Sequence, residues 1–208
     1  MTNLLATIAA SLADAQGLDD IVQAFYTDGL VVIQNAIPTA LTNALLAEVS
    51  QRADLQQAGV GRGGQSLLDQ QIRRDKTVWL DGSTAAQQDY MALLDQLQQA
   101  VNQRCFLGLT HYECHFAHYQ AGDFYQKHLD AFVGRSNRRL TTVCYLNDSP
   151  DGGHLRVYNE QDQWLADVAP QAGMLVVFES ERFPHEVLPA AADRYSIAGW
   201  FRIDSPVL

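Results

Sequence analysis

The chain has 208 residues, of which 47% are hydrophobic and 18% are charged, a composition typical of one globular domain with its own core. Its formal net charge of −10 argues against nucleic acid as a partner, because an acidic surface repels phosphate groups. The three cysteines form no CxxC pair, so we expect reduced thiols rather than a disulfide framework or a zinc knuckle.

Residues 1 to about 104 are predicted to be mainly helical. Apolar side chains recur at helical spacing over residues 4–12, which predicts a first helix that stops near Gly17. The same spacing over residues 21–25 predicts a second helix. A short apolar run at residues 30–33 then has the length of a strand.

A third helix is predicted to open at Pro38 and to end at Gly59. Proline suits the first helical turn, and glycine suits a C-cap. The glycine-rich segment 59–76 follows as a surface loop, because a helix rather than a strand precedes it and a nucleotide-binding turn needs the strand. Residues 76–80 are predicted to form a strand.

The fourth predicted helix begins near Ser83, where Thr84 and Gln87 can form a capping box. From about residue 105 to 203, short β-rich runs alternate with turn residues, which is typical of a sandwich or barrel. We expect the helices to pack against the outside of this β-core, so that residues 1–208 form a single domain.

Two side chains at the end of one predicted strand are candidate metal ligands. In His128-Leu129-Asp130, the alternation of a strand places the imidazole and the carboxylate on one face. His185, which follows another strand-like run, can supply a second imidazole. Two histidines and one carboxylate form the facial triad of non-haem iron(II) oxygenases. The pattern therefore predicts an iron site.

A basic side chain near the C-terminus is a candidate for binding a carboxylate. Arg194 comes nine residues after His185, in the run DRYSIAGWF. On a strand, Arg194 shares its face with Ser196, Ala198 and Trp200. A fixed guanidinium with a hydroxyl two residues away can hold a carboxylate by charge-assisted hydrogen bonds.

A second histidine cluster offers an alternative metal site. His111 and His115 have the HxxxH spacing of a helical zinc site, but the glutamate of that motif is misplaced and the segment is predicted to be a strand. On a strand, His118 points away from the other two. We therefore expect these residues to be exposed strand histidines.

The motifs HLD, CYLN, GGHLRVY, FPHEV and DRYSIAGWF, in this order, resemble the protein prolyl 4-hydroxylases of the iron(II)/2-oxoglutarate oxygenase superfamily. The resemblance is greatest to the animal oxygen-sensing prolyl hydroxylases and their bacterial relatives, and it covers roughly residues 59–203. It implies an α+β fold with a double-stranded β-helix core, of the jelly-roll or cupin-like kind, and N-terminal packing helices.

The resemblance also implies roles for the candidate residues. The triad would bind iron(II). Arg194 would pair with the distal carboxylate of 2-oxoglutarate, assisted by the hydroxyls of Tyr145 and Ser196, and Tyr119 would approach the metal-proximal end of this co-substrate. The catalytic residues implied in this way are His128, Asp130, His185 and Arg194.

The substrate contacts implied by the resemblance lie around the same pocket. Tyr125 and Trp200 would line the entry of the target proline, and Arg62 and Arg73 belong to a loop that matches the family's substrate-covering loop. One departure is Ala198, where the animal enzymes carry a hydroxyl residue, which can alter how a metal-bound water is held.

The implied activity is hydroxylation of a prolyl residue at C4, with O2 and 2-oxoglutarate as co-substrates and ascorbate as reductant. Bacterial relatives suggest a protein substrate, namely translation elongation factor Tu. Three alternatives are a hydroxylase of a small molecule or free amino acid in the same superfamily, a nucleic-acid demethylase of the same fold, and a cupin-like metal-binding sensor without turnover. The acidic charge argues against the demethylase. We expect a monomer.

The N-terminal segment lacks the basic leader of a signal peptide, and no apolar run is long enough to span a bilayer. Both features favour a cytoplasmic protein without a membrane partner.

Overall fold

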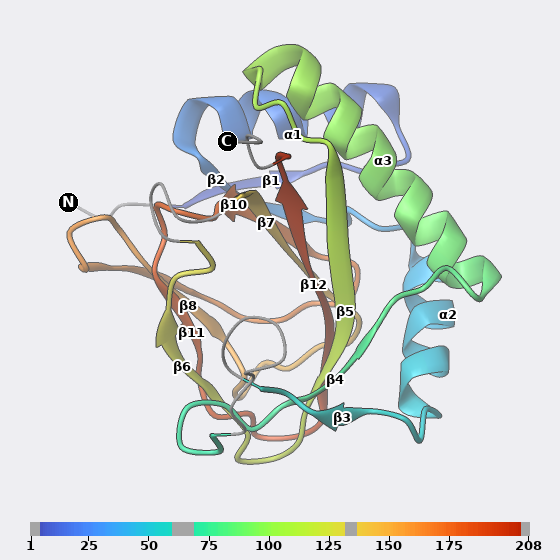
Figure 1. Ribbon diagram of the computed structural model, residues 1–208, viewed down its shortest axis with the longest axis vertical. Helices are drawn as coiled ribbons and strands as arrows, with labels where there is room; N and C mark the ends of the chain where they lie inside the picture. Colours follow the sequence, from blue (N-terminus) through green and yellow to red (C-terminus); the bar gives the residue numbers. More distant parts are fainter. Residues whose placement is uncertain (1–4, 60–68, 132–136, 205–208) are drawn as a thin grey trace.

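Two β-sheets packed face to face form the centre of the molecule (Figure 1). The computed structural model describes residues 5–59, 69–131 and 137–204. Within them the larger sheet has eight strands in the spatial order β1-β2-β10-β7-β12-β5-β4-β3, and the smaller sheet has four in the order β6-β11-β8-β9. The two sheets form the expected double-stranded β-helix core.

The strands from β5 onward build most of this core. They are β5 (His111–Tyr119), β6 (Tyr125–His128), β7 (Arg138–Tyr145), β8 (Leu155–Tyr158), β9 (Trp164–Val168), β10 (Leu175–Glu179), β11 (His185–Val187) and β12 (Arg194–Arg202). The long strands β5, β7 and β12 are adjacent, which gives the large sheet a rigid middle.

The N-terminal segment differs from the prediction in its first element. The residues expected to open a helix instead form strand β1 (Ala6–Ala9), which pairs in parallel with β2 (Leu30–Gln34). Pairing with β2 satisfies the backbone of β1, and this outweighs the helical spacing of its apolar residues. The predicted strand at residues 30–33 is confirmed by β2.

The first helix, α1 (Ala15–Asp28), starts at Asp14, whose carboxylate accepts a hydrogen bond from the N–H of Gly17. Gly17 is therefore in the first turn of a helix and does not stop one, contrary to the prediction. A Cβ at Gly17 would lie 2.5 Å from the carbonyl oxygen of Ser11, so the close backbone approach explains this glycine.

Helix α2 (Thr39–Ser50) opens after Pro38 as predicted, but it ends well before Gly59. After the helix ends, residues 56–57 form the short strand β3 (Gln56–Gln57) instead of continuing the helix. β3 pairs with β4 (Lys76–Trp79), the strand predicted at residues 76–80.

Helix α3 (Ala85–Cys105) confirms the predicted fourth helix, and Thr84 caps it by accepting from the N–H of Gln87. The reciprocal half of the capping box is absent, because the Gln87 side chain accepts from the N–H groups of Asp81 and Gly82.

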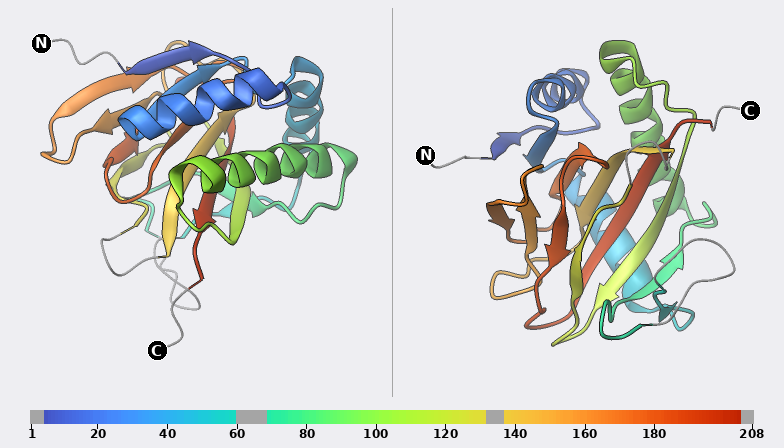
Figure 2. Two further views of the ribbon diagram at one scale, coloured as in Figure 1. Left: turned by 90° about the horizontal axis from the view of Figure 1, so that it is seen from above. Right: turned by 60° about the vertical axis from the view of Figure 1, so that its left-hand side comes forward.

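The large sheet separates two hydrophobic cores. Adjacent residues of one strand point into different cores: Cys144 packs on the helix side, whereas Tyr145 packs between the sheets. Helices α1 and α3 lie side by side over the helix side, as Figure 2 shows. The helices therefore do not fill the space between the two sheets. This space holds the side chains that point inward from the strands, among them residues of the predicted site.

All three cysteines are unpaired, and Cys114 and Cys144 are buried, in line with the prediction of reduced thiols. Among the described residues, none of the helices combines the length and apolar character needed to traverse a bilayer.

Candidate metal centre and carboxylate pocket

The predicted triad comes together between the two sheets. His128 ends β6 and His185 begins β11, and the two residues are paired across the small sheet. The Nε2 atoms of His128 and His185 lie 3.7 and 3.6 Å from the carboxylate oxygens of Asp130. Asp130 itself lies beyond the end of β6, so a bend rather than strand alternation brings it to the histidines.

Hydrogen bonds orient both imidazoles toward the carboxylate. The Nδ1 of His128 lies 2.8 Å from the carbonyl oxygen of Gln126, and the Nδ1 of His185 lies 3.0 Å from that of Phe183. A carbonyl only accepts, so Nδ1 carries the proton and Nε2 presents its lone pair to the centre. Burial and the neighbouring His185 lower the pKa of His128 to about 3, so its ring is neutral at physiological pH, as a metal ligand must be.

The charge of the centre resides on Asp130. Burial alone would raise the pKa of this carboxyl, but His185 and His128 hold the pKa below its ordinary value, with a smaller contribution from the hydroxyl of Thr141. Thr141 donates to Oδ2 of Asp130 over 2.8 Å. The carboxylate is therefore ionised and can act as a ligand.

The donor set fits a divalent transition metal. The ligand atoms of His128, Asp130 and His185 all lie within 4.8 Å of one another, and within the described ranges they form the one such group of three. Two imidazole nitrogens and one carboxylate oxygen, with other positions open, are the ligands typical of non-haem iron(II).

Arg194 begins β12, lies on the face of the large sheet that is turned toward the small sheet, and is 1% exposed. Its Nε donates to the carbonyl of Gly153 (3.1 Å), and its Nη1 donates to the hydroxyl of Ser196 (2.9 Å). A Cβ at position 153 would lie 3.0 Å from the Arg194 side chain, so a glycine lets the backbone approach the guanidinium.

No carboxylate of the described residues pairs with Arg194, so a fully buried cation is left without a counter-charge. Its guanidinium lies 4.7 Å from the ring centre of Tyr119 and 5.0 Å from that of Tyr145. The hydroxyl of Tyr145 is buried, and it lies near enough to Arg194 for the guanidinium to oppose the rise in its pKa, but no contact with the described residues has the geometry of a hydrogen bond. Burial raises the pKa of Tyr145, so this hydroxyl keeps its proton and can donate. Such a pocket fits a carboxylate.

The predicted substrate contacts border the metal centre. The ring of Tyr125 stacks on His128 with 3.7 Å between centres, and the guanidinium of Arg73 lies 4.3 Å above Tyr125. Arg73 is itself fixed by the buried carboxylate of Asp75. Arg62 lies outside the described residues, as do residues 60–68, which are half of the glycine-rich segment.

Trp200 is 9% exposed, and its indole N–H has no hydrogen-bond partner. This N–H lies near enough to Asp130 to contribute to the lowered pKa of that carboxyl, although the contact does not have the geometry of a hydrogen bond. The guanidinium of Arg138 lies 4.0 Å above the Trp200 ring.

The second histidine cluster does not assemble. His118 pairs with Asp193 and stacks on Tyr195 on the far side of the strand from His115. His111 is exposed as expected, but His115 is buried, contrary to the prediction, because it packs against Trp79 and Trp200.

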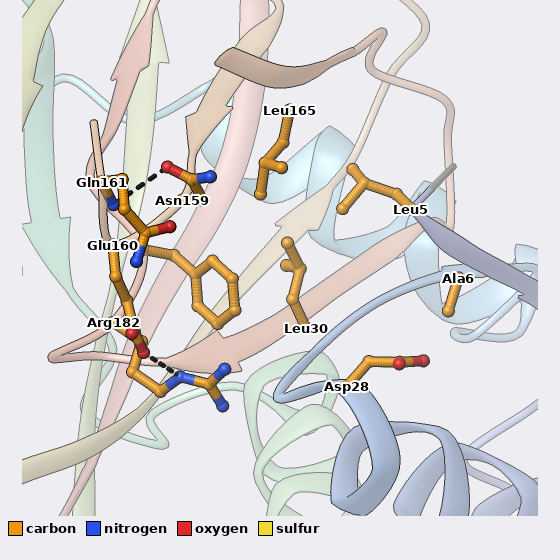
Figure 3. A pocket seen from close by; sticks show the side chains of 10 residues that line it. Leu5, Ala6, Asp28, Leu30, Asn159, Glu160, Gln161, Leu165 and Arg182 are labelled. Carbon is orange, nitrogen blue, oxygen red and sulfur yellow. Dashed lines mark hydrogen bonds and ion pairs between the residues drawn. The ribbon is translucent and has the colours of Figure 1, made fainter. Parts of the chain in front are cut away.

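A separate cavity of about 300 Å³ opens between the β1–β2 edge and the loop that joins β8 to β9. Figure 3 shows the apolar side chains of Leu5, Leu30 and Leu165 turned into it, beside the ion pair of Arg182 and Glu160. None of the predicted site residues that the structure describes lines this cavity.

The sequence patterns did not predict Thr141 and Ser180 as site residues. Thr141 faces the site because it alternates with Val143 and Tyr145 on β7, so its direction could have been read from the strand. Nothing local indicates that it contacts Asp130.

Known proteins resemble this chain in both sequence and fold. The family model described as the 2OG-Fe(II) oxygenase superfamily matches residues 114–202. A solved Pseudomonas putida prolyl-4-hydroxylase is 39% identical, with a TM-score of 0.79 over 90% of this chain and 100% of that one. A Trichoplax adhaerens prolyl hydroxylase, solved in complex with a hypoxia-inducible factor peptide fragment, is 27% identical, with a TM-score of 0.75 over 89% and 88% of the two chains.

Among curated proteins, Egl nine homolog 1 of Rattus norvegicus is 32% identical over 62% of this chain and 41% of its own length. The chain spans between 12% and 41% of the length of this protein, its human and mouse counterparts and a nematode hypoxia-inducible factor prolyl hydroxylase.

Proposed function

Because this chain belongs to the 2OG-Fe(II) oxygenase superfamily, we propose that it is a prolyl 4-hydroxylase acting on a prolyl residue of a protein substrate. It would use iron(II), 2-oxoglutarate and O2. The observation that carries this proposal is that a histidine–aspartate–histidine triad and a buried arginine lie between the two sheets, and that this arginine has no ion-pair partner among the described residues.

His128, Asp130 and His185 would hold the iron through two imidazole nitrogens and one ionised carboxylate oxygen. When bound, iron and 2-oxoglutarate supply the oxidising power that inserts one oxygen atom of O2 into a C–H bond, with succinate and carbon dioxide as co-products. The protein contributes the orientation of the ligands and the exclusion of water.

Arg194 would bind the distal carboxylate of 2-oxoglutarate, because burial removes competing water and strengthens a charge-assisted hydrogen bond. Tyr145 would donate its unpartnered hydroxyl to the same carboxylate, and Ser196 would orient the guanidinium. Tyr119 would form the wall of the pocket nearer to the metal.

Tyr125, Trp200 and Arg73 would form the entry for the target proline. The Tyr125 ring packs on His128, and the Trp200 indole helps to lower the pKa of Asp130, so both aromatic side chains border the metal ligands. The resemblance of the motifs to bacterial prolyl hydroxylases supports translation elongation factor Tu as the protein substrate. The resemblance also supports ascorbate as reductant, and we expect a cytoplasmic monomer.

The alternatives differ in what the carboxylate pocket is for. A metal-binding sensor without turnover needs no buried cation beside the metal, so Arg194 argues for an enzyme. A hydroxylase of a small molecule or free amino acid would keep the same cofactor site and differ only in the substrate entry.

A hydroxyproline map of cells with and without the gene tests the proposal. We expect one protein to lose a single 4-hydroxyproline, and purified wild-type protein to restore it while releasing succinate. The Asp130→Ala protein should restore neither. Succinate release without any hydroxyproline change would exclude protein prolyl hydroxylation and leave the small-molecule alternative.

A further inference from the structure

The three residues of the metal centre are held in two different ways. Each histidine is oriented by a carbonyl two residues earlier in its own strand region, that of Gln126 or Phe183. Asp130 lies past the end of β6, outside the strand ladder. Its carboxylate accepts a hydrogen bond from the opposite sheet, from the hydroxyl of Thr141.

Thr141 is a rigid donor. It lies in the middle of β7, paired with Phe178 of β10 on one side and with Trp200 of β12 on the other. It is 1% exposed, so no solvent competes for its hydroxyl. Two strand ladders thus fix the point in space from which the hydroxyl reaches Oδ2 of Asp130.

A second hydroxyl continues this chain of hydrogen bonds. Ser180, directly after β10, is fully buried, and its Oγ lies 2.9 Å from Oγ1 of Thr141. A hydroxyl has one proton to donate, and the ionised carboxylate of Asp130 can only accept. Thr141 therefore donates to Asp130, and Ser180 donates to Thr141. Hydrogen bonds in such a row polarise and strengthen one another.

The hydroxyls of Thr141 and Ser180 are buried among apolar side chains. Val143 of the same strand and Phe178, which pairs with Thr141, belong to the hydrophobic core between the sheets, and a buried hydroxyl costs stability unless it is hydrogen-bonded. A valine has nearly the shape of threonine and would fill position 141 without this cost. The hydrogen bonds from Ser180 to Thr141 and from Thr141 to Asp130 end on a candidate metal ligand, which explains why two hydroxyl residues occupy this apolar region.

We propose that Thr141 and Ser180 are positioning residues that fix the rotation of the Asp130 carboxylate for the metal, with Ser180 acting through Thr141. The inference rests on the proposed iron(II) site, but not on the identity of the substrate. Hydrogen-bonded partners of metal ligands typically contribute about 10- to 100-fold to metal affinity.

The direct test is the affinity of the purified protein for manganese(II), measured by electron paramagnetic resonance titration without 2-oxoglutarate. Thr141→Val should weaken manganese binding by about 10- to 100-fold. Thr141→Ser keeps the hydroxyl and should restore the affinity to within about 3-fold of wild type. Ser180→Ala should cause a smaller loss, because Thr141 still donates directly to the carboxylate.

Thr142→Val is the matched control. Thr142 is equally buried in the same strand, but its hydroxyl faces the other way, toward the carbonyl of Gly199 at 3.4 Å. Its manganese affinity should stay within about 2-fold of wild type. Thermal unfolding of both valine variants separates a loss of metal affinity from a loss of folding.

The visible spectrum of bound cobalt(II) gives a second readout, because it reports the arrangement of the ligands. We expect Thr141→Val to change this spectrum and Thr141→Ser to restore it. Equal manganese affinity and equal cobalt spectra for the Thr141→Val and Thr142→Val proteins would overturn the inference. Failure of the wild-type protein to bind manganese would instead overturn the proposed metal site itself.

Discussion

The two ends of the inner face of β7 and β12 differ in whether their polar groups have partners. At one end, His128, Asp130 and His185 are each held by hydrogen bonds, and the negative charge of Asp130 is stabilised by its neighbours. At the other end, no described residue supplies Arg194 with a counter-charge or the hydroxyl of Tyr145 with a hydrogen bond. Thr141 and Tyr145, which mark the two ends, are four residues apart on β7, roughly 13 Å along the strand.

This difference indicates how each end meets its ligand. The proposed metal end is preorganised, so a metal would bind there without rearrangement of side chains. The proposed carboxylate end would stay unsatisfied until an anion binds, so the protein without 2-oxoglutarate would bear the cost of a buried charge that no described residue pairs with. Binding at this end should therefore change stability, and each end should respond to mutation independently.

The largest effect is expected at the metal end. Asp130→Ala removes the only anionic ligand of the triad, so succinate release should fall by more than the roughly 100-fold expected for losing an outer hydrogen-bond partner. The fold should survive, because both histidines keep their hydrogen bonds to backbone carbonyls. Asp89 is an exposed residue of α3, so Asp89→Ala is the control and should keep wild-type turnover. An active Asp130→Ala protein would remove the triad from consideration.

Arg194→Ala should separate the two ends. Removing one partner of a buried charge pair costs about 2–5 kcal/mol, so 2-oxoglutarate binding to the manganese-loaded protein should weaken by about 30-fold or more. Manganese affinity without 2-oxoglutarate should change little. Isothermal titration of both ligands checks this, and a parallel loss of both affinities would contradict the independence of the two ends.

Much of this site could be predicted from the sequence, because local patterns carry it. The strand alternation over Arg194 and Ser196 places the guanidinium and the hydroxyl on one face, and they form the expected contact. The prediction for Asp130 reached the right place for the wrong reason, since a bend and not a strand brings it to the histidines. The three residues of β11 are too few for any periodicity to be visible.

Long-range contacts explain what the sequence did not reveal. The helical spacing of residues 4–12 predicts a helix, and only the pairing of β1 with a strand 25 residues later makes it a strand. The contact of Ser180 with Thr141 joins residues 39 positions apart. Burial of His115 likewise depends on Trp200, which belongs to a neighbouring strand.

The stability of the wild-type protein should rise when 2-oxoglutarate fills the carboxylate end. At a concentration 100 times its dissociation constant, a ligand contributes about 2.7 kcal/mol, which corresponds to a Tm increase of roughly 5–11 °C for a chain of this size. Differential scanning fluorimetry with manganese present in every sample measures the shift. Arg194→Ala should abolish it, whereas an equal shift in that variant would place 2-oxoglutarate elsewhere.

The smallest effect is expected at Tyr145, where removing the hydroxyl should stabilise the protein without 2-oxoglutarate but weaken the binding of 2-oxoglutarate. Its hydroxyl is buried without a partner, and an unsatisfied buried polar group costs about 1–3 kcal/mol. Tyr145→Phe should therefore raise the free energy of urea unfolding of the protein without 2-oxoglutarate by about 1 kcal/mol. It should also weaken 2-oxoglutarate binding by about 5- to 10-fold, which is the effect of losing one hydrogen bond. Tyr112→Phe is the comparison, because the Tyr112 hydroxyl donates to the carbonyl of Met91 and its removal should destabilise the protein without affecting the ligand. If Tyr145→Phe destabilised the ligand-free protein as Tyr112→Phe does, the hydroxyl would already be satisfied, and the contrast between the two ends would rest on Arg194 alone.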